Sequence, residues 1–158
     1  MKVLEFTGLK AASANKVADR LQQLLADYQV YYTNLRNFHW NVKGHDFFQL
    51  HSQLEKMYDD MAEKVDEVAE RILMLGSVPE SKFSAYLKQA KIKEAEITSN
   101  GEQIIENLLH TISYFIGEER EILSLASENG DEVTVSMLSD YLKEQEKLVW
   151  MLTAYLNK

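Results

Sequence analysis

Apolar residues recur every three or four positions along most of this chain, which is the period of an amphipathic helix. The first stripe is formed by Val17, Leu21, Leu24, Tyr28, Tyr31 and Leu35. A second pattern stops at Gly76, with Pro79 just beyond it, and this pair is typical of a helix end. We therefore predict four long helices, which run from about Ser13 to Trp40, from about Phe47 to Leu75, from Asn100 to Asn129, and from Asp131 onward through Tyr155.

The connections between these helices indicate how they pack. Each helix is roughly 40 Å long at a rise of 1.5 Å per residue, and four such helices favour a four-helix bundle. The outer connections are short and predict two antiparallel hairpins. The middle connection can cross the bundle from end to end, and it holds a helix-like piece, FSAYLKQAK, between Ser81 and Lys91. The predicted fold is all-α: a ferritin-like four-helix bundle with a short extra helix between helices two and three, in a single domain over 1–158.

Composition limits the compartment and the partners. The chain has 158 residues, no cysteine and a net charge of −8, from 25 acidic and 17 basic residues. No apolar run is long enough for a signal peptide or a membrane span, so we expect a cytoplasmic protein with no membrane partner. An acidic surface repels phosphate and no basic tail offsets it, so DNA binding is expected to be weak or absent.

Three of the four histidines lie in the stretch NFHWNVKGHDFFQLH, and the last of them, His51, begins a polar stripe on the second helix. At 100° per residue, His51, Glu55, Asp66 and Glu70 fall within an arc of about 100°. His51 with Glu55, and Asp66 with Glu70, are each one turn apart and can chelate as pairs. The pairs are 11 residues apart, roughly 16 Å, whereas a ligand atom lies about 2 Å from its metal. One metal ion therefore cannot reach both pairs on a single helix.

An antiparallel copy of the same helix removes this difficulty. The position midway between His51 and Glu70 is also midway between Glu55 and Asp66. A single two-fold register therefore brings His51 opposite Glu70 and Glu55 opposite Asp66, once at each end of the contact, as two-fold symmetry requires. The small residue Ala62 lies near the crossing point and favours close approach. The pattern predicts two identical metal sites, each shared between two subunits.

The end of the first helix offers one more nitrogen. His39 becomes a candidate ligand if that helix end lies beside His51. Two plainer interpretations stay open. Acids on one face of a long helix are usually solvated, and Asp66 can equally pair with Arg71 or Lys64. A lone histidine is more often a hydrogen-bonded core or surface residue than a ligand.

The residues around these positions resemble the signature of a known family. The run FHWNVKG, then FFQLH and the acid Glu55, then DEVAERI and LG, is similar to helices one and two of the Dps family. These are the DNA-protection-during-starvation proteins, or mini-ferritins. The ending GDE…LSDYLKEQEKLVWML is similar to that family's fourth helix, so the resemblance covers nearly the whole chain.

The resemblance implies a hollow dodecamer with ferroxidase sites at its two-fold interfaces. The family's ligand positions match the following residues, three from one subunit and two from its neighbour: His39, His51 and Glu55, then Asp66 and Glu70. The family often has Asp in place of Glu55. The implied activity is oxidation of Fe(II), with hydrogen peroxide as the preferred oxidant, followed by storage of a ferric mineral and protection against oxidative stress. Carboxylates with imidazole suit iron, and zinc or other divalent metals bind such sites too.

Other polar residues have separate interpretations. His45 has no ligand counterpart in the family, and we expect it at the surface of the turn. His110, in the middle of the third helix, is expected to be partly buried and hydrogen-bonded. Trp40 is either an interface aromatic or a residue placed to intercept stray oxidising equivalents. The resemblance also points to acids that line a pore through which iron enters: Asp131, Glu132 and Asp140.

Three other classes of function compete with this one. A conventional ferritin or rubrerythrin-like protein holds its di-iron site inside each subunit and needs Glu-x-x-His motifs on two helices. No Glu in this chain is followed by His three positions later. A DNA-compacting member of the family commonly uses a flexible basic tail, which this chain almost entirely lacks. The third class is a metal-free structural bundle, and metal analysis with native mass measurement separates it from the others.

Overall fold

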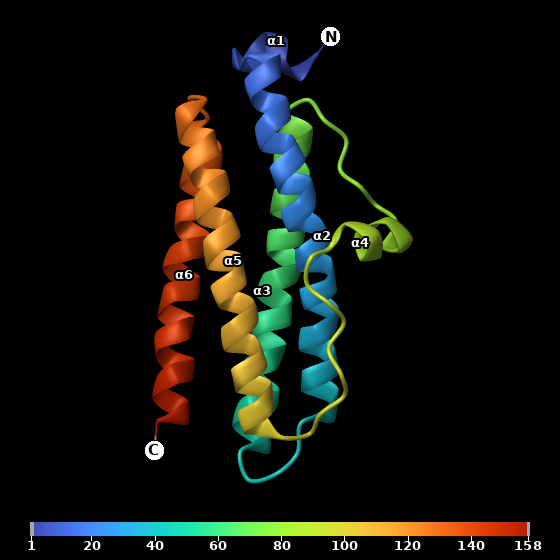
Figure 1. The fold of residues 1–158 in the computed structure, drawn as a ribbon, viewed down its shortest axis with the longest axis vertical. Helices are drawn as coiled ribbons and strands as arrows, with labels where there is room; N and C mark the ends of the chain where they lie inside the picture. The colour runs from blue at the N-terminus through green and yellow to red at the C-terminus, as the bar shows by residue number, and fades with distance from the viewer. Residues whose placement is uncertain (1, 158) are drawn as a thin grey trace.

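The structure, a computed structural model, describes residues 2–157 (Figure 1). Over that range the chain is helical with no strand, so the all-α prediction is confirmed. Its helices are α1 (Val3–Thr7), α2 (Ala11–Asn41), α3 (Phe47–Met74), α4 (Phe83–Gln89), α5 (Gly101–Glu128) and α6 (Glu132–Leu156). Met1 and Lys158, the ends of the domain predicted over 1–158, lie outside the described residues, and the one-domain division stays a prediction.

The four long helices form the predicted bundle. α2 packs against α3 and α5 packs against α6, each pair joined by a short connection, and α2 also contacts α5 (Figure 1). The long connection between α3 and α5 carries the short helix α4 and returns the chain from one end of the bundle to the other (Figure 1). The expected crossover and its extra helix are therefore confirmed.

Local signals in the sequence set three of the ends of the long helices. The side chain of Asn100 accepts a hydrogen bond from the backbone N–H of Gln103 and caps α5. Asp131 accepts one from the backbone N–H of Thr134 and caps α6. Gly76 follows α3 with φ of +80°, a left-handed conformation that glycine adopts without strain. These three ends agree with the prediction.

The N-terminal helix α1 is not predicted by the sequence pattern. It has only five residues and ends at Gly8, whose N–H bonds to the carbonyl of Leu4. A Cβ added to Gly76 would lie 3.2 Å from the Leu4 side chain, so α1 packs closely on the turn after α3. The position of α1 depends on this tertiary contact, which the period of a five-residue segment cannot reveal.

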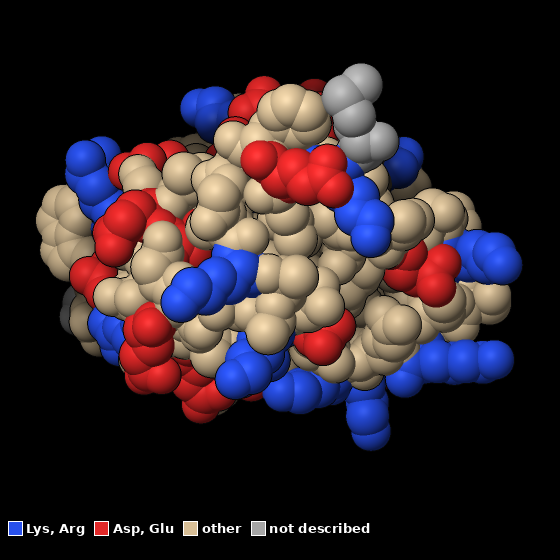
Figure 2. All heavy atoms as spheres, turned by 90° about the horizontal axis from the view of Figure 1, so that it is seen from above, with Lys and Arg blue, Asp and Glu red and all other residues tan. Residues whose placement is uncertain are grey.

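Charged side chains of both signs lie at the surface. On the end of the bundle that Figure 2 shows, acidic and basic side chains are interspersed among uncharged ones. None of the helices within residues 2–157 is long and apolar enough to cross a membrane.

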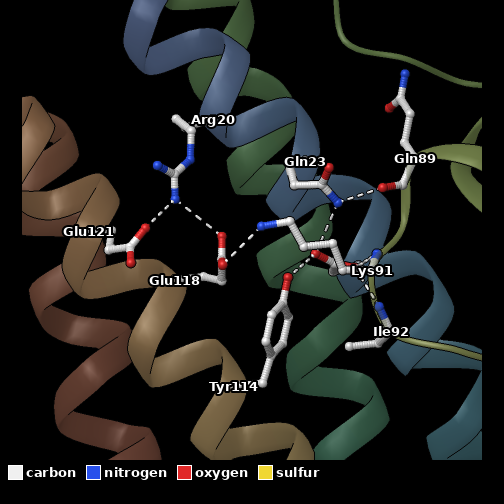
Figure 3. A network of polar contacts seen from close by, with 9 residues as sticks. Arg20, Gln23, Gln89, Lys91, Ile92, Tyr114, Glu118 and Glu121 are labelled. Atoms are coloured by element: carbon white, nitrogen blue, oxygen red, sulfur yellow. Dashed lines mark hydrogen bonds and ion pairs between the residues drawn. The ribbon is translucent and has the colours of Figure 1, made fainter.

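Side chains of α2 hold the crossover connection in place. The buried carboxylate of Asp27 accepts hydrogen bonds from the backbone N–H of Lys91 at 2.6 Å and of Ile92 at 3.0 Å (Figure 3). It also accepts from the Tyr114 hydroxyl at 2.7 Å and from the Gln23 amide (Figure 3). Irregular backbone beside a bundle needs such partners, because its own polar groups have no helix to pair with.

A second anchor lies two turns further along α2. The Asn34 amide donates to the carbonyl of Lys93 at 2.9 Å and accepts from the N–H of Ala95 at 2.8 Å. Asn37 donates to the carbonyl of Ala95 at 3.0 Å. The connection is thus fixed against α2 and delivers the chain to the start of α5.

The interior is mainly apolar, and its aromatic residues pack edge to face, with Tyr28 and Phe115 5.0 Å apart at their ring centres. Polar side chains are also buried among the described residues: Asp27, Asn34, His39, Lys64, Arg71, Glu119, Asp131, Thr134 and Gln145. Each such group needs a hydrogen-bonding or charged partner to offset its lost hydration.

Candidate metal centre

The α2–α3 hairpin brings two of the predicted ligands together. His39 lies near the end of α2 and His51 in the first turns of α3. Their imidazole rings stack with centres 3.7 Å apart and an angle of 21° between the planes. The expectation that the end of the first helix lies beside His51 is confirmed.

The two histidines hold each other through the backbone. The Nδ1 atom of His39 lies 2.8 Å from the carbonyl oxygen of His51, and the Nδ1 atom of His51 lies 2.9 Å from the carbonyl oxygen of His39. A carbonyl oxygen can only accept, so each Nδ1 must carry the hydrogen. In the neutral ring the other nitrogen, Nε2, then has a free lone pair. A hydrogen bond of this kind commonly fixes the tautomer of a metal-binding histidine.

Aromatic side chains fix the planes of both rings. Phe47 stacks on His51 with ring centres 4.9 Å apart and an angle of 27° between the planes. Tyr58 meets His39 edge to face at 5.2 Å and 85°. Burial, and then the charge of Glu55, raises the pKa of the Tyr58 hydroxyl. Tyr58 therefore contacts His39 and lies within the electrostatic influence of Glu55, a placement that no motif in the sequence reveals.

The three predicted carboxylates lie along the exposed side of α3. Glu55, Asp66 and Glu70 are all exposed in the single chain. Among the described residues of one chain, no three His, Cys, Asp or Glu side chains come together to hold a metal ion. One chain thus assembles the two histidines but not the acids beside them, and the five-residue ligand set stays a prediction.

The two bases near Asp66 and Glu70, Lys64 and Arg71, form ion pairs with other acids. Lys64 is buried, with its ammonium 2.5 Å from Asp60 and 2.7 Å from Glu144. Burial opposes the charge of Lys64, but hydrogen bonds to these two carboxylates leave its pKa raised. Arg71 is also buried, 2.5 Å from Asp131. The alternative in which Asp66 pairs with Lys64 or Arg71 is therefore wrong.

The acid pair is left without a counter-charge. Across residues 2–157, neither Asp66 nor Glu70 makes an ion pair. Glu70 also lines a groove of about 530 Å³ between α3 and α6, together with other acids that the site prediction did not include: Asp60, Glu63, Glu67, Asp140 and Glu144. Three bases, Lys64, Arg71 and Lys143, line the same groove, so acids outnumber bases on this side of α3.

Two secondary predictions need correction. Asp131 is 4% exposed, and it bonds to Arg71 and to the hydroxyl and backbone N–H of Thr134, so it caps α6 and cannot line a pore. His110 is exposed rather than partly buried, because it lies on the solvent side of α5. His45 is exposed in the turn before α3, as predicted.

Trp40 is 64% exposed in the single chain, and the Arg36 guanidinium lies 4.8 Å from the centre of its ring. An exposed tryptophan beside His39 fits both predicted roles, an interface aromatic and a residue that intercepts oxidising equivalents. Glu132 and Asp140 are exposed, and their predicted place in a pore stays a prediction.

Known proteins match this chain over nearly its full length. The Ferritin-like domain family matches residues 18–158. A DNA protection during starvation protein from Porphyromonas gingivalis is 53% identical over 99% of this chain and 99% of its own length. The chain belongs to the Dps family of ferritin-like proteins.

Solved Dps structures agree with the fold. The crystal structure of a Dps protein from Vibrio cholerae, described as a member of a broad superfamily of ferritin-like diiron-carboxylate proteins, is 47% identical. It superposes with a TM-score of 0.92 and covers 94% of both chains. A Dps protein from Bacillus brevis is 35% identical, with a TM-score of 0.90 over 94% of this chain and 100% of that one. The ferritin-like fold prediction is therefore confirmed.

We predict that His39 and His51 both carry the hydrogen on Nδ1 when neutral, because each Nδ1 faces a carbonyl oxygen. Nitrogen-15 NMR of the assembled, metal-free, histidine-labelled protein should show two rings of the Nδ1–H type. The exposed His45 and His110 serve as internal controls and should favour the usual Nε2–H form. An Nε2–H signal from His39 or His51 would contradict the assignment.

Proposed function

We propose that this Dps-family chain is a ferroxidase and iron-storage protein whose metal sites are shared between two subunits. One observation carries the proposal: the hairpin leaves the Nε2 atoms of His39 and His51 free for metal binding, yet a single chain brings no complete ligand set together within residues 2–157. In this proposal the missing ligands come from another copy of the chain.

The proposed site takes His39, His51 and Glu55 from one subunit and Asp66 and Glu70 from its neighbour. The two-fold register of α3 supports this set, because it places each histidine end opposite an acid end. The lack of ion pairs at Asp66 and Glu70 among the described residues supports it too, since a bound cation would supply the counter-charge that no side chain provides.

The donor set favours iron as the substrate. Imidazole and carboxylate ligands bind Fe(II) and leave positions open for water and oxidant. Oxidation of two Fe(II) by one hydrogen peroxide gives two Fe(III) and two hydroxide ions, so no hydroxyl radical is released. Zinc or another divalent metal would compete for the same ligands.

Storage follows from assembly in this proposal. The protein forms a hollow dodecamer in the cytoplasm, the ferric product moves inward, and the mineral grows in the cavity, which protects the cell against oxidative stress. The family membership supports this account, and the acidic groove beside Glu70 supplies exposed carboxylates next to the site.

Replacing Asp66 with Asn and Glu70 with Gln in one variant should abolish rapid Fe(II) oxidation by peroxide. The side chains keep their size but lose the charges that hold the metal. Groups that only support metal ligands cost about 10- to 100-fold when changed, so the loss of two ligands should cost at least that much in rate. Stopped-flow absorbance on the assembled protein measures it.

The matched control replaces Glu94 and Glu96 with Gln, which removes the same charge from the crossover connection. This control should oxidise iron at the wild-type rate. Unchanged kinetics in the Asp66→Asn, Glu70→Gln variant, with its helical spectrum intact, would sink the site assignment.

DNA binding should be weak or absent near neutral pH. Each chain carries a net charge of −8, which assembly multiplies, and acidic side chains lie among the basic ones on the end shown in Figure 2. A gel-shift assay at low salt should show free DNA, and a stable complex under those conditions would refute this prediction.

A further inference from the structure

The centre of the bundle holds a polar cluster that the proposed metal site does not use. Glu119 on α5 is 0% exposed. Its Oε1 atom accepts hydrogen bonds from the Tyr28 hydroxyl on α2 and from the Gln145 amide nitrogen on α6, the latter at 2.7 Å. One oxygen of a fully buried carboxyl group is thus well satisfied.

The remaining oxygens of this cluster have no partner. Within the described residues, Glu119 Oε2 and Gln145 Oε1 are buried and make no hydrogen bond. Both are acceptors if Glu119 is a carboxylate, so they cannot pair with each other. A buried carboxylate oxygen and a buried amide oxygen that both lack a hydrogen-bond donor are costly.

We propose that Glu119 is a proton-binding site in the core: its carboxyl group is neutral, and its Oε2–H donates to Gln145 Oε1. Together with the amide donation to Oε1, this closes a ring of two hydrogen bonds between an acid and an amide. The added proton turns Glu119 Oε2 from an acceptor into a donor. Glu119 Oε2 and Gln145 Oε1 then form a hydrogen bond with each other, so neither atom lacks a partner.

The charged and titratable groups around Glu119 do not supply a counter-ion. Tyr28 on α2 and Tyr141 on α6 are uncharged hydroxyls near it. Burial raises the pKa of both, and for Tyr141 the hydrogen bond to Glu67 raises it further. Lys64 on α3 is the cation that acts on it, and its ammonium is already bound to Asp60 and Glu144. No ion pair joins an ammonium or guanidinium to this carboxyl group among residues 2–157.

The pKa of Glu119 agrees with a neutral carboxyl group, as the unpaired oxygens do. Burial raises the pKa of Glu119 to about 7, although the hydrogen bonds from Tyr28 and Gln145 lower it. An isolated glutamate has a pKa of about 4.3. Between these values the folded chain holds a proton that the unfolded chain has released.

This assignment separates the bundle core from the metal chemistry. Ferritin-like di-iron bundles direct glutamate and histidine ligands into the core. Here the core glutamate is paired with an amide and two tyrosines lie close by, so its role is to join α2, α5 and α6. Changes at Glu119 should therefore leave Fe(II) oxidation unaffected, which makes the proposal independent of the proposed function.

The sign of the pH effect follows from proton linkage. Because the folded state binds more protons than the unfolded state between about pH 4.3 and pH 7, stability from this group is lost as pH rises through that window. Above about pH 7 the loss is complete. An amide in place of the carboxyl group has no proton to lose.

The test compares wild type, Glu119→Gln and Glu106→Gln by thermal unfolding at fixed protein concentration between about pH 5 and pH 9. The amide introduced by Glu119→Gln can form the same ring with Gln145, so this variant should gain several degrees in Tm relative to wild type as pH rises. Glu106 is exposed on the same helix, and its variant should show no such pH-dependent gain. Both variants should keep wild-type iron oxidation.

Infrared spectroscopy of the wild type provides a readout that does not need a variant. A carboxylic-acid C=O band should persist at about pH 6, where exposed carboxyl groups are ionised, and should disappear above about pH 8. Glu119→Gln should lack this band and Glu106→Gln should retain it. Absence of the band in wild type, or equal pH dependence of Tm in wild type and Glu119→Gln, would overturn the proposal.

Discussion

The rise of the α-helix limits how this chain can bind a metal ion. α3 is unbroken from Phe47 to Met74, so Glu55 and Asp66 stay about 16 Å apart along it. Because the helix is continuous, His51 and Glu70 of one chain cannot reach the same ion. In the proposed function the chain therefore presents two half-sites, and the chemistry depends on a second subunit. Activity would then require assembly, because the same contact that pairs the subunits would complete the ligand set.

The bundle interior has a different role. Its charged groups are matched within the chain: Lys64 by two carboxylates, and Arg71 by Asp131. Among residues 2–157, Glu119 has no counter-ion and is proposed to be neutral, hydrogen-bonded to an amide and a tyrosine hydroxyl. Buried charges that lack partners are costly, so in a stable core each buried charge is paired with an opposite charge or a hydrogen-bonding group. The exposed side of α3, by contrast, keeps carboxylates without a base, and those are the ones proposed to bind iron.

Features set by neighbouring residues could be predicted from the sequence, and features set by distant contacts could not. The caps at Asn100 and Asp131 and the stop at Gly76 are local, so the four long helices were predictable. The partner of Asp131 is 60 residues away, so the local sequence does not reveal its burial, and the pore role rested on the resemblance alone. A glutamate on a helix normally indicates surface, so the pattern gave no sign of buried Glu119. The histidine pair was predictable, but the carbonyl contacts that orient it depend on the packing of the hairpin.

Mixed assemblies test the shared site most directly. One variant carries His51→Ala and the other carries Asp66→Asn with Glu70→Gln, and each alone should lack rapid Fe(II) oxidation. In a pair formed by one subunit of each kind, one of the two sites keeps all its ligands. Co-assembly in equal amounts should therefore restore about a quarter of the wild-type oxidation amplitude. If the mixed assemblies recover no activity although native mass measurement shows both chains in one particle, the sites are not shared between subunits.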